Sequence, residues 1–458
     1  MPAKTIMDYA AAGFECSCGR RHRTDIRQLL IDDHAISQLP SLVRDQKKAD
    51  GSGFDPDSQS ALIIADDNTW QAAGSTVSQL LTADHIKVSQ LVFPGKPDLI
   101  PDEKAVFQVI TALRPHTAVL IAAGSGTIND LVRFVSYKTQ KPYICVPTAP
   151  SMDGYASSVA PMIHNNLKTT YETWGAAALV TQPDILASCP SKMLAAGLGD
   201  ILGKYTALAD WRLGGIVEHE YECPLIADMV TKTADRSLSQ ARQLAGRDPQ
   251  AVRETMEGLL MTGIAMSYAG NSRPASGAEH HLSHFWEMVL MQKKKPPVLH
   301  GSKVGLATPM IASLYHHIQK LQPDFERARK KAARFSFDQW AATIENVYGT
   351  GAPEVIALGR KTAKNSPDRT LSRLAAAEKN WEQIRRAAAD LVPEPDQIYQ
   401  ALQSVGAPVS PVELGIEDSQ VLLAVRHAAE MRDRYTVLQL YTDLDLLDEA
   451  ESIVTQWL

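Results

Sequence analysis

The sequence has no long hydrophobic run and no excess of basic residues, and each absence excludes a class of protein. The longest apolar stretches, such as TAVLIAAG at 117–124, are much shorter than the roughly 20 residues that cross a bilayer, so we predict no membrane insertion. Lys and Arg number 46 against 52 Asp and Glu, a net charge of −6. We therefore expect no nucleic-acid partner, because no basic surface is indicated.

Cysteine is also scarce, and the N-terminus lacks the apolar core of a signal peptide. The N-terminal stretch MPAKTIMDYAAAGFE has no sustained hydrophobic segment before a cleavage site. An odd, scattered set of cysteines is typical of reduced thiols in a cytosol. We therefore expect a cytoplasmic protein. The five cysteines are at positions 16, 18, 145, 189 and 223.

A chain of 458 residues with 45% hydrophobic residues suits two domains. Up to about residue 190, short apolar runs such as ALIIADDNT (61–69) and KVSQLVFPG (87–95) alternate with helical stretches, which predicts a parallel sheet with crossover helices. Beyond that point apolar residues recur at helical spacing with little strand signal. We predict an α/β domain over 1–189 and a mostly α-helical domain over 190–458, with ligands in the cleft between them.

A glycine turn lies where the strand TAVLIAAG gives way to the helix INDLVRF. Gly124 and Gly126 flank Ser125 there, so backbone N–H groups at a helix N-terminus can approach a pyrophosphate. The complete G-x-G-x-x-G fingerprint is absent because position 129 is Asn, and a plain tight turn explains the glycines about equally well.

Asp66 and Asp67 end an earlier predicted strand. A carboxylate in that place can bind the ribose hydroxyls of a dinucleotide, although it can also be the N-cap of the next helix. Together with the glycine turn, this favours a dinucleotide site in the first domain. The acidic residue favours NAD over NADP, whose 2′-phosphate it would repel.

Four histidines are concentrated in SGAEHHLSHFWE (276–287) and LHGSKVG (299–305). His280 and His284 are four residues apart and would share one helix face, whereas His281 would point elsewhere, exposed or structural. His300 would return a third imidazole from a separate element. The protease motif H-E-x-x-H is not present. Packed, hydrogen-bonded histidines remain the alternative to a metal site.

A carboxylate often completes a histidine metal site that leaves one position open for catalysis. Asp200 in AAGLGDILGKY is the candidate, because a lone carboxylate is costly to bury in such an apolar helix. The alternative is an ion pair between Asp200 and Lys204, four residues on, along an exposed face.

Six segments, in this order, resemble a known family. They are AGSGTINDLVRF, PTAPSMDGYAS, GLGDILGKYTALADW, SGAEHHLSH, LHGSKVG and RDRYTVLQL. The chain resembles the metal-dependent polyol dehydrogenases that share the dehydroquinate synthase fold, and within them the bacterial branch of the sn-glycerol-1-phosphate dehydrogenases. The resemblance covers essentially the whole chain. It implies a dinucleotide-binding first domain, a helical second domain that binds metal and substrate, and a homodimer.

The resemblance also implies a set of site residues. Asp200, His280 and His300 would hold one Ni²⁺ or Zn²⁺, while His284 and Asp153 would face the substrate as catalytic residues. Lys204 is a candidate phosphate ligand from its spacing alone. The residues expected to bind NAD(H) or NADP(H) are Asp66, Gly124, Ser125, Gly126, Thr127, Ile128, Asp130, Thr148, Ser151 and Ser157.

The implied reaction is the reversible reduction of dihydroxyacetone phosphate to sn-glycerol 1-phosphate, the enantiomer found in archaeal-type ether lipids. His284 could relay the proton. One alternative is a glycerol dehydrogenase-like enzyme. Another is a dehydroquinate synthase-like lyase, although that family typically has Glu in place of Asp200 and a different histidine motif. A non-catalytic NAD- or metal-binding regulator is a third.

FECSCGRRH places Cys16, Cys18 and His22 close together near the N-terminus. Because this trio lacks a fourth ligand, the sequence favours a structural turn over a second zinc site.

Overall fold

The computed structural model describes the chain except for residues 1–5, 7–8, 10–12, 47–50, 52 and 165–166. Two compact units are formed, and each is described by itself. The first unit comprises Met1–Gly197 and Arg242–Asn271, and the second comprises Leu198–Ala241 and Ser272–Leu458. The sequence predicts one boundary after residue 189, whereas the contacts also assign 242–271 to the first unit.

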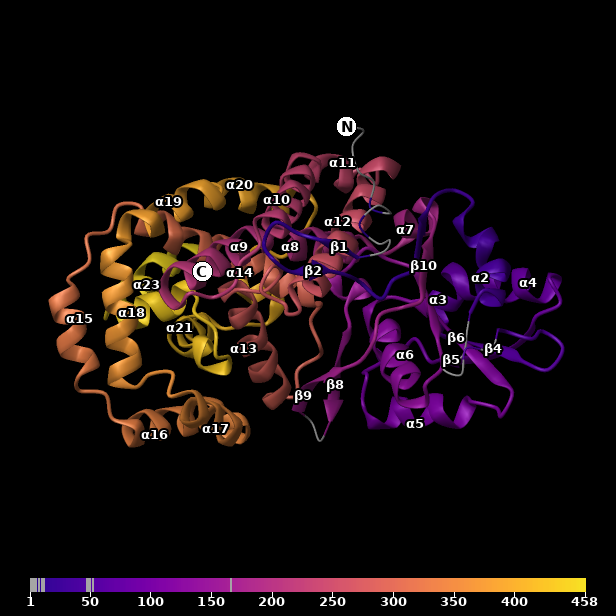
Figure 1. Cartoon of the computed structure of the whole chain (residues 1–458), viewed down its shortest axis with the longest axis horizontal. Coiled ribbons are helices and arrows are strands. Elements are labelled where there is room, and N and C mark those ends of the chain that lie inside the picture. The colour runs from indigo at the N-terminus through magenta and orange to yellow at the C-terminus, as the bar shows by residue number, and fades with distance from the viewer. Residues whose placement is uncertain (1–5, 7–8, 10–12, 47–50, 52, 165–166) are drawn as a thin grey trace. The chain divides into compact units, whose positions relative to one another are not determined.

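A six-stranded parallel sheet forms the centre of the first unit (Figure 1), as predicted. In spatial order its strands are β3 (Gln28–Ile31), β10 (Ala178–Thr181), β7 (Tyr143–Pro147), β6 (Thr117–Gly124), β4 (Ser60–Asp66) and β5 (Lys87–Phe93). The β6 side chains are all buried, as expected for a parallel strand covered on both faces. The chain runs from β4 to β5 on one side and then crosses to β6 on the other. Sheets of this kind bind ligands at such a reversal of strand order.

Helices and two small antiparallel hairpins complete the first unit. The hairpins, which the sequence did not reveal, are β1 (Phe14–Glu15) with β2 (Arg21–His22) and β8 (Val159–His164) with β9 (Leu167–Glu172). The helices are η1 (Ala35–Gln38), α2 (Leu39–Arg44), α3 (Asp67–Thr69), the π-helix η2 (Trp70–Gly74), α4 (Ser75–Ala83), α5 (Glu103–Ala112), α6 (Gly126–Thr139), η3 (Asp153–Ala156), α7 (Pro183–Ser188) and α12 (Pro249–Ala269).

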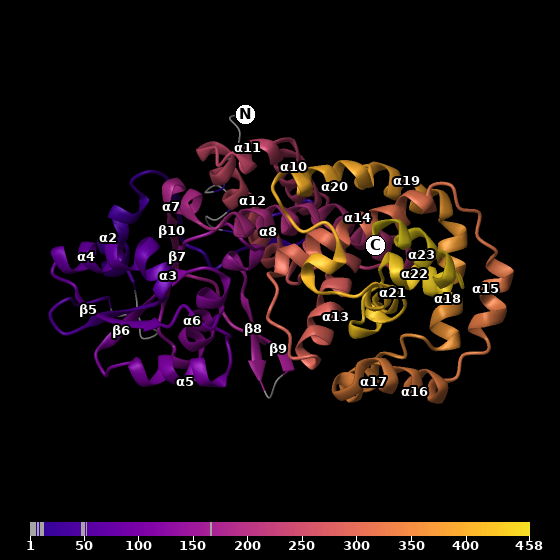
Figure 2. The same ribbon diagram turned by 180° about the vertical axis from the view of Figure 1, so that it is seen from behind.

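The described secondary-structure elements of the second unit are all helices, which confirms the predicted mostly α-helical architecture. Figure 2 shows α15 (Phe325–Ala332) beside α18 (Pro367–Lys379) and α16 (Phe337–Tyr348) beside α17 (Ala352–Thr362). The helices α9 (Lys204–Glu218), α13 (Ala278–Gln292) and α14 (His300–Ile318) pack on one another, and Trp211 of α9 and Trp286 of α13 are buried. Helices α8 (Ser191–Leu202) and α11 (Ala241–Ala245) cross the limits between the units.

The remaining helices of this unit are α9 (Lys204–Glu218), α10 (Pro224–Ser239), α13 (Ala278–Gln292), α14 (His300–Ile318), α15 (Phe325–Ala332), α16 (Phe337–Tyr348), η4 (Gly349–Gly351), α17 (Ala352–Thr362), α18 (Pro367–Lys379), α19 (Trp381–Leu391), α20 (Pro395–Ser404), η5 (Pro411–Leu414), α21 (Asp418–His427), η6 (Ala428–Met431), α22 (Val437–Asp443), α23 (Leu447–Val454) and η7 (Thr455–Trp457). Among the described residues, no helix combines the length and apolar character needed to cross a bilayer.

Candidate metal centre and cofactor site

Asp200 in α8, His280 in α13 and His300 in α14 lie together, and all three residues belong to the second unit. One ligand atom from each lies within 4.8 Å of the others. The Asp200 Oδ1 to His280 Nε2 distance is 3.8 Å, and the centroids of the His280 and His300 rings are 5.0 Å apart. One carboxylate and two imidazoles suit a zinc-like divalent cation and leave coordination positions open for a substrate. The donor set therefore fits a catalytic metal.

The close approach of α8 and α14 accounts for this convergence. A Cβ added at Gly199 would lie 2.4 Å from the carbonyl oxygen of Gly301 and 3.2 Å from Cα of Gly305. Only glycine permits two helix backbones to meet at such a distance. Asp200 directly follows the first of these glycines, and His300 directly precedes Gly301.

Asp200 and Lys204 form an ion pair, as the alternative interpretation of the sequence proposed, but the pair is fully buried rather than exposed. Lys204 Nζ donates to Asp200 Oδ1 over 2.7 Å and to the carbonyl of Ala275 over 3.1 Å. Burial alone raises the pKa of the Asp200 carboxyl. The positive charge of Lys204 is the largest of the opposing effects, and the pKa is lowered to about 2. Asp200 is thus an anion at neutral pH.

Glu279 orients the first imidazole. His280 Nδ1 lies 2.7 Å from Glu279 Oε1, and the buried carboxylate also accepts from the Gly277 amide (2.7 Å) and the Thr206 hydroxyl (2.6 Å). Burial, followed by the charge of Lys204, holds the pKa of His280 well below its usual value. The ring is therefore neutral, and a proton on Nδ1 leaves the Nε2 lone pair directed to the Asp200 side.

Asp210 fixes the start of α13, the helix that carries these histidines. Its Oδ2 accepts from the Ala278 amide over 2.6 Å, and its Oδ1 accepts from the Tyr315 hydroxyl and the Val437 amide, each over 2.6 Å. The N-cap residue Gly277 has no side chain to supply this bond, and a Cβ there would lie 2.4 Å from Asp210 Oδ2. Sequence reasoning missed Asp210, because its partners lie far along the chain. It also missed the role of Glu279, because sequence spacing does not show which group a buried carboxylate contacts.

His284 lies at the edge of the ligand cluster. Its ring centroid is 5.7 Å from that of His300 and 6.1 Å from that of His280, and the side chain is 23% exposed. Glu287 lies 3.5 Å from His284 and 3.6 Å from the ammonium of Lys303, so it connects the two. His281, by contrast, is buried, and neither ring nitrogen has a hydrogen-bond partner among the described residues.

In the first unit, Asp66 and Gly124 end the paired strands β4 and β6, whose register aligns Ile64 with Ala122. Asp66 Oδ1 accepts from the Thr69 amide over 2.9 Å, and the Asp66 amide donates to the Thr69 hydroxyl, also over 2.9 Å. These two bonds form a capping box, so Asp66 is the N-cap of the next helix. The sequence allowed this role as the alternative to a ribose contact. The ribose contact itself stays a prediction.

Helix α6 begins immediately after β6, so its first-turn amides lie at the carboxyl edge of the sheet. A Cβ at Gly124 would lie 2.6 Å from Cβ of Ile128, and one at Gly126 would lie 2.8 Å from Met152 Cε. Asn129 is buried, and its side-chain amide has no hydrogen-bond partner among the described residues. A helix N-terminus beside an unsatisfied buried amide fits the pyrophosphate of a dinucleotide.

Arg133 organises the loops around this edge and was not foreseen from the sequence. Its buried guanidinium donates to Asp130 (2.8 Å), to the Tyr143 hydroxyl (3.1 Å) and to the carbonyls of Tyr155 (3.0 Å) and Val159 (2.8 Å). Four other predicted site residues are also buried, and their contacts to cofactor or substrate stay predictions. They are Thr148, Ser151, Asp153 and Ser157.

Comparison with known proteins decides the family. Residues 31–190 match the profile of the iron-containing alcohol dehydrogenases. The chain is 35% identical to glycerol-1-phosphate dehydrogenase [NAD(P)+] of Halalkalibacterium halodurans over 93% of this chain and 94% of that protein. The enzyme of the same name from Geobacillus stearothermophilus is 33% identical, over 96% and 98% of the two chains. The chain belongs to the glycerol-1-phosphate dehydrogenase family.

This membership confirms the resemblance drawn from six motifs, and with it an oxidoreductase. A crystal structure of glycerol dehydrogenase from Schizosaccharomyces pombe superposes with a TM-score of 0.59 over 94% of this chain and 90% of that one. At 15% identity it shows the fold alone. The expected α/β and helical architecture of this dehydrogenase family is thereby confirmed.

Proposed function

We propose that this protein catalyses the reversible reduction of dihydroxyacetone phosphate to sn-glycerol 1-phosphate with NAD(P)H. The observation that carries the proposal is the Asp200, His280 and His300 cluster, in a chain 35% identical to a glycerol-1-phosphate dehydrogenase [NAD(P)+]. When bound, a divalent cation supplies Lewis-acid chemistry and the nicotinamide supplies the hydride.

The chain's own residues would bind the substrate and move a proton. Asp200, His280 and His300 would hold the cation, with Glu279 fixing the His280 ring through its 2.7 Å contact. The C2 oxygen must gain a proton as the carbonyl becomes an alcohol. We assign that proton to His284, which borders the ligand cluster and is partly exposed.

Two further substrate contacts are proposed. Asp153 would bind the substrate hydroxyl, in keeping with its place in PSMDGYAS. Lys204 was predicted to bind the phosphate. Its ammonium donates instead to Asp200 and the Ala275 carbonyl, so a phosphate contact would have to compete with a buried ion pair. The variant Lys204→Met separates the role in the ion pair from the role in phosphate binding.

For the dinucleotide we propose Asp66 at the ribose and the 124–130 turn at the pyrophosphate. Thr148, Ser151 and Ser157 would line the rest of the site. A carboxylate beside the ribose favours NAD(H), because it repels the 2′-phosphate of NADP(H).

The identity of the metal, the oligomeric state and the cellular location are further parts of the proposal. Carboxylate and imidazole ligands suit both Ni²⁺ and Zn²⁺, and reconstitution with each ion decides between them. We also propose a cytoplasmic homodimer, which light scattering would test. Phe107 and Ile110 are 66% and 42% exposed on α5, three residues apart, and are the first positions to substitute if a dimer is found.

The test is an NADH-oxidation assay with dihydroxyacetone phosphate on metal-stripped protein, with nickel or zinc added back. We expect turnover only with added metal, and a chiral assay should identify the product as sn-glycerol 1-phosphate. Preference for unphosphorylated dihydroxyacetone would favour a glycerol dehydrogenase-like enzyme. No turnover with either ion would contradict the proposal.

A further inference from the structure

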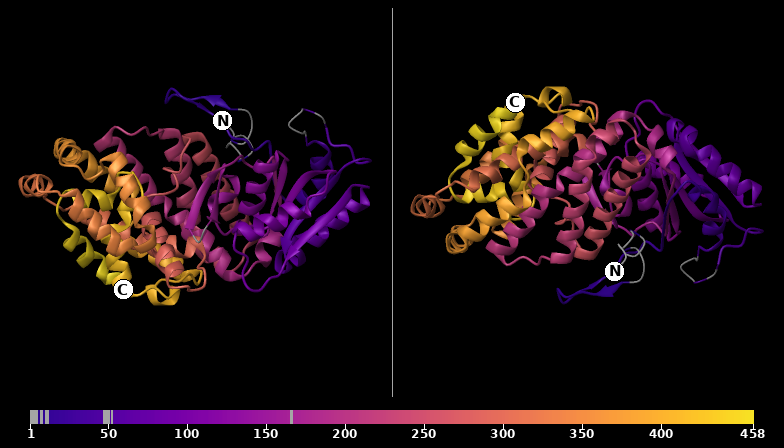
Figure 3. Two further views of the ribbon diagram at one scale, coloured as in Figure 1. Left: turned by 90° about the horizontal axis from the view of Figure 1, so that it is seen from below. Right: turned by 90° about the horizontal axis from the view of Figure 1, so that it is seen from above.

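The N-terminal hairpin β1–β2 directs two thiols and an imidazole toward one point. The strands pair Phe14 with His22, and the turn between them closes through bonds from the Gly19 amide to Cys16 (3.0 Å) and from the Cys16 amide to Arg20 (3.1 Å). Gly19 adopts a φ of +84°, which favours glycine. Figure 3 shows the hairpin standing apart from the six-stranded sheet of its unit.

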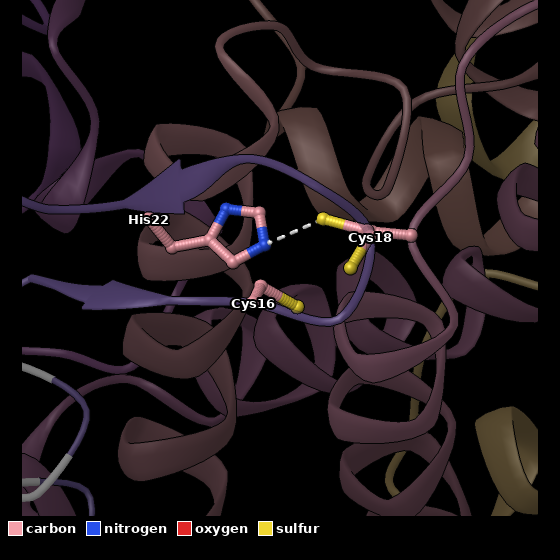
Figure 4. Close-up of side chains that lie close together, drawn as sticks. Cys16, Cys18 and His22 are labelled. Atoms are coloured by element: carbon pink, nitrogen blue, oxygen red, sulfur yellow. Dashed lines mark hydrogen bonds between the residues drawn. The ribbon is translucent and has the colours of Figure 1, made fainter.

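The three side chains have the spacing of metal ligands (Figure 4). Cys18 Sγ lies 3.4 Å from His22 Nε2, and the ligand atoms of Cys16, Cys18 and His22 all lie within 4.8 Å of one another. In a tetrahedral site with Zn–S about 2.3 Å and Zn–N about 2.1 Å, neighbouring ligand atoms are about 3.5–3.8 Å apart. Small side-chain movements would therefore suffice to enclose a cation.

A second contact prepares His22 for this role. Its Nδ1 lies 3.0 Å from the carbonyl oxygen of Tyr268 in α12, an acceptor that requires the proton on Nδ1. The lone pair is then on Nε2, the nitrogen that faces Cys18. The ring is fully buried, stacked on Tyr268 at 5.3 Å and in edge contact with Phe14 at 5.5 Å. Metal-binding histidines are held in the same way, by a carbonyl on the other nitrogen.

We propose that Cys16, Cys18 and His22 form a second, structural metal site that takes Zn²⁺ or a similar thiophilic cation. The sequence favoured a structural turn because only three ligands were visible. The orientation of the imidazole, which sequence spacing cannot show, favours a metal site instead. The fourth coordination position is taken by a solvent oxygen or by one more thiol of the chain, and X-ray absorption counts the sulfurs directly.

The fold gives such a cation a role. Each strand of the hairpin has only two residues, and an isolated two-stranded hairpin is marginally stable in water. A cation held by both thiols and His22 would close the turn. Through the bond to Tyr268 it would also hold the hairpin on α12. Thiolate ligands distinguish this site from the Asp200 cluster, which has none.

The experiment loads the full-length protein with Co²⁺ and records its absorption and metal content. We expect two ions per chain and a sulfur-to-cobalt charge-transfer band. In the protein with zinc in both sites, X-ray absorption should give an average of at least one sulfur per zinc, because only one of the two sites holds thiolates. The double variant Cys16→Ser/Cys18→Ser should lose one ion and the band while keeping the other ion. His22→Asn should weaken binding, and Cys189→Ala, a thiol control in the same unit, should change neither quantity.

A single ion per chain without a sulfur band in the unaltered protein would overturn the proposal. So would a band that survives in the double variant, or a disulfide between Cys16 and Cys18 found by mass spectrometry of protein purified under reducing conditions. The absorption and sulfur count of the unaltered protein do not depend on whether a variant folds. None of these readouts depends on turnover, so failure here leaves the proposed dehydrogenase activity standing.

Discussion

His280 Nδ1 lies 2.7 Å from Oε1 of Glu279, its immediate neighbour in the chain. This contact decides which nitrogen of the imidazole is available on the Asp200 side. Three donors converge on the Glu279 carboxylate, and its own pKa is raised by burial. Glu279 is therefore a positioning residue, whose effect on catalysis passes through His280.

Glu279→Gln should lower the affinity for the catalytic metal by about 10–100-fold, because loss of an outer carboxylate typically costs that much. Competition with a chelator of known affinity measures it. Thr206→Val removes the hydroxyl that donates to the other oxygen of Glu279 and to the Gly203 carbonyl, and it should have a smaller effect on metal affinity. If Glu279→Gln bound metal as tightly as the unaltered protein, the orienting role would be refuted.

The two histidines of α13 should behave differently. His280→Ala should lose the catalytic metal and turnover together. His284→Ala should keep the metal and lose rate, because His284 borders the cluster without belonging to it. Metal content and NADH oxidation, measured on the same preparations, check both statements. Equal metal loss in the two variants would show that the ligands had been assigned wrongly.

Lys204→Met would remove the ammonium that pairs with the buried Asp200 carboxylate. We expect the metal-free variant to be destabilised by about 3–5 kcal/mol, and bound nickel to restore most of the loss by replacing the ammonium. Thermal melting with and without nickel measures this. The matched control is Lys232→Met, which breaks the exposed pair with Asp228 and should cost about 0.5 kcal/mol or less.

An unchanged melting temperature in Lys204→Met, accompanied by a KM that rises for dihydroxyacetone phosphate and not for dihydroxyacetone, would instead place Lys204 on the phosphate. The two readouts therefore distinguish the ion pair from the predicted substrate contact.

Asp66 combines a cap with a proposed ribose contact, and two substitutions separate them. Asp66→Asn keeps a good N-cap and removes the charge, so it should shift cofactor preference toward NADPH with little change in stability. Asp66→Ala should also lose about 1 kcal/mol of stability. Asp102, which caps α5 through a 2.8 Å bond to the Ala105 amide, is the control.

For Asp102→Ala we expect the same loss of stability and an unchanged NADH to NADPH ratio of kcat/KM. If the NADH to NADPH ratio of kcat/KM were also unchanged in both Asp66 variants, Asp66 would act only as a helix cap.

The sheet was predictable because its central strands are continuous apolar runs with turn signals on either side. The β8–β9 hairpin was not, because VAPMIH and LKTTYE show no clean alternation of apolar and polar residues. The place of α12 in the first unit was not predictable either. It depends on Gly263, where an added Cβ would lie 2.6 Å from Cβ of Ala156, a contact that sequence cannot reveal.

The ligand cluster was predictable from residue types and motif order, and the structure places Asp200, His280 and His300 together. Their supporting residues were not predictable. Asp210 reaches α13 from 68 positions away in the chain. The burial of the Asp200–Lys204 pair likewise depends on which helix faces meet, and spacing alone is equally compatible with an exposed pair.

The proposed dehydrogenase activity requires one cation held by Asp200, His280 and His300. Nickel titration of metal-free Cys16→Ser/Cys18→Ser protein isolates this requirement, because the proposed thiolate site is then absent. NADH oxidation with dihydroxyacetone phosphate should rise in proportion to bound nickel and level off at one ion per chain. Turnover in the metal-free protein equal to that of the loaded protein would show that the cation is not required.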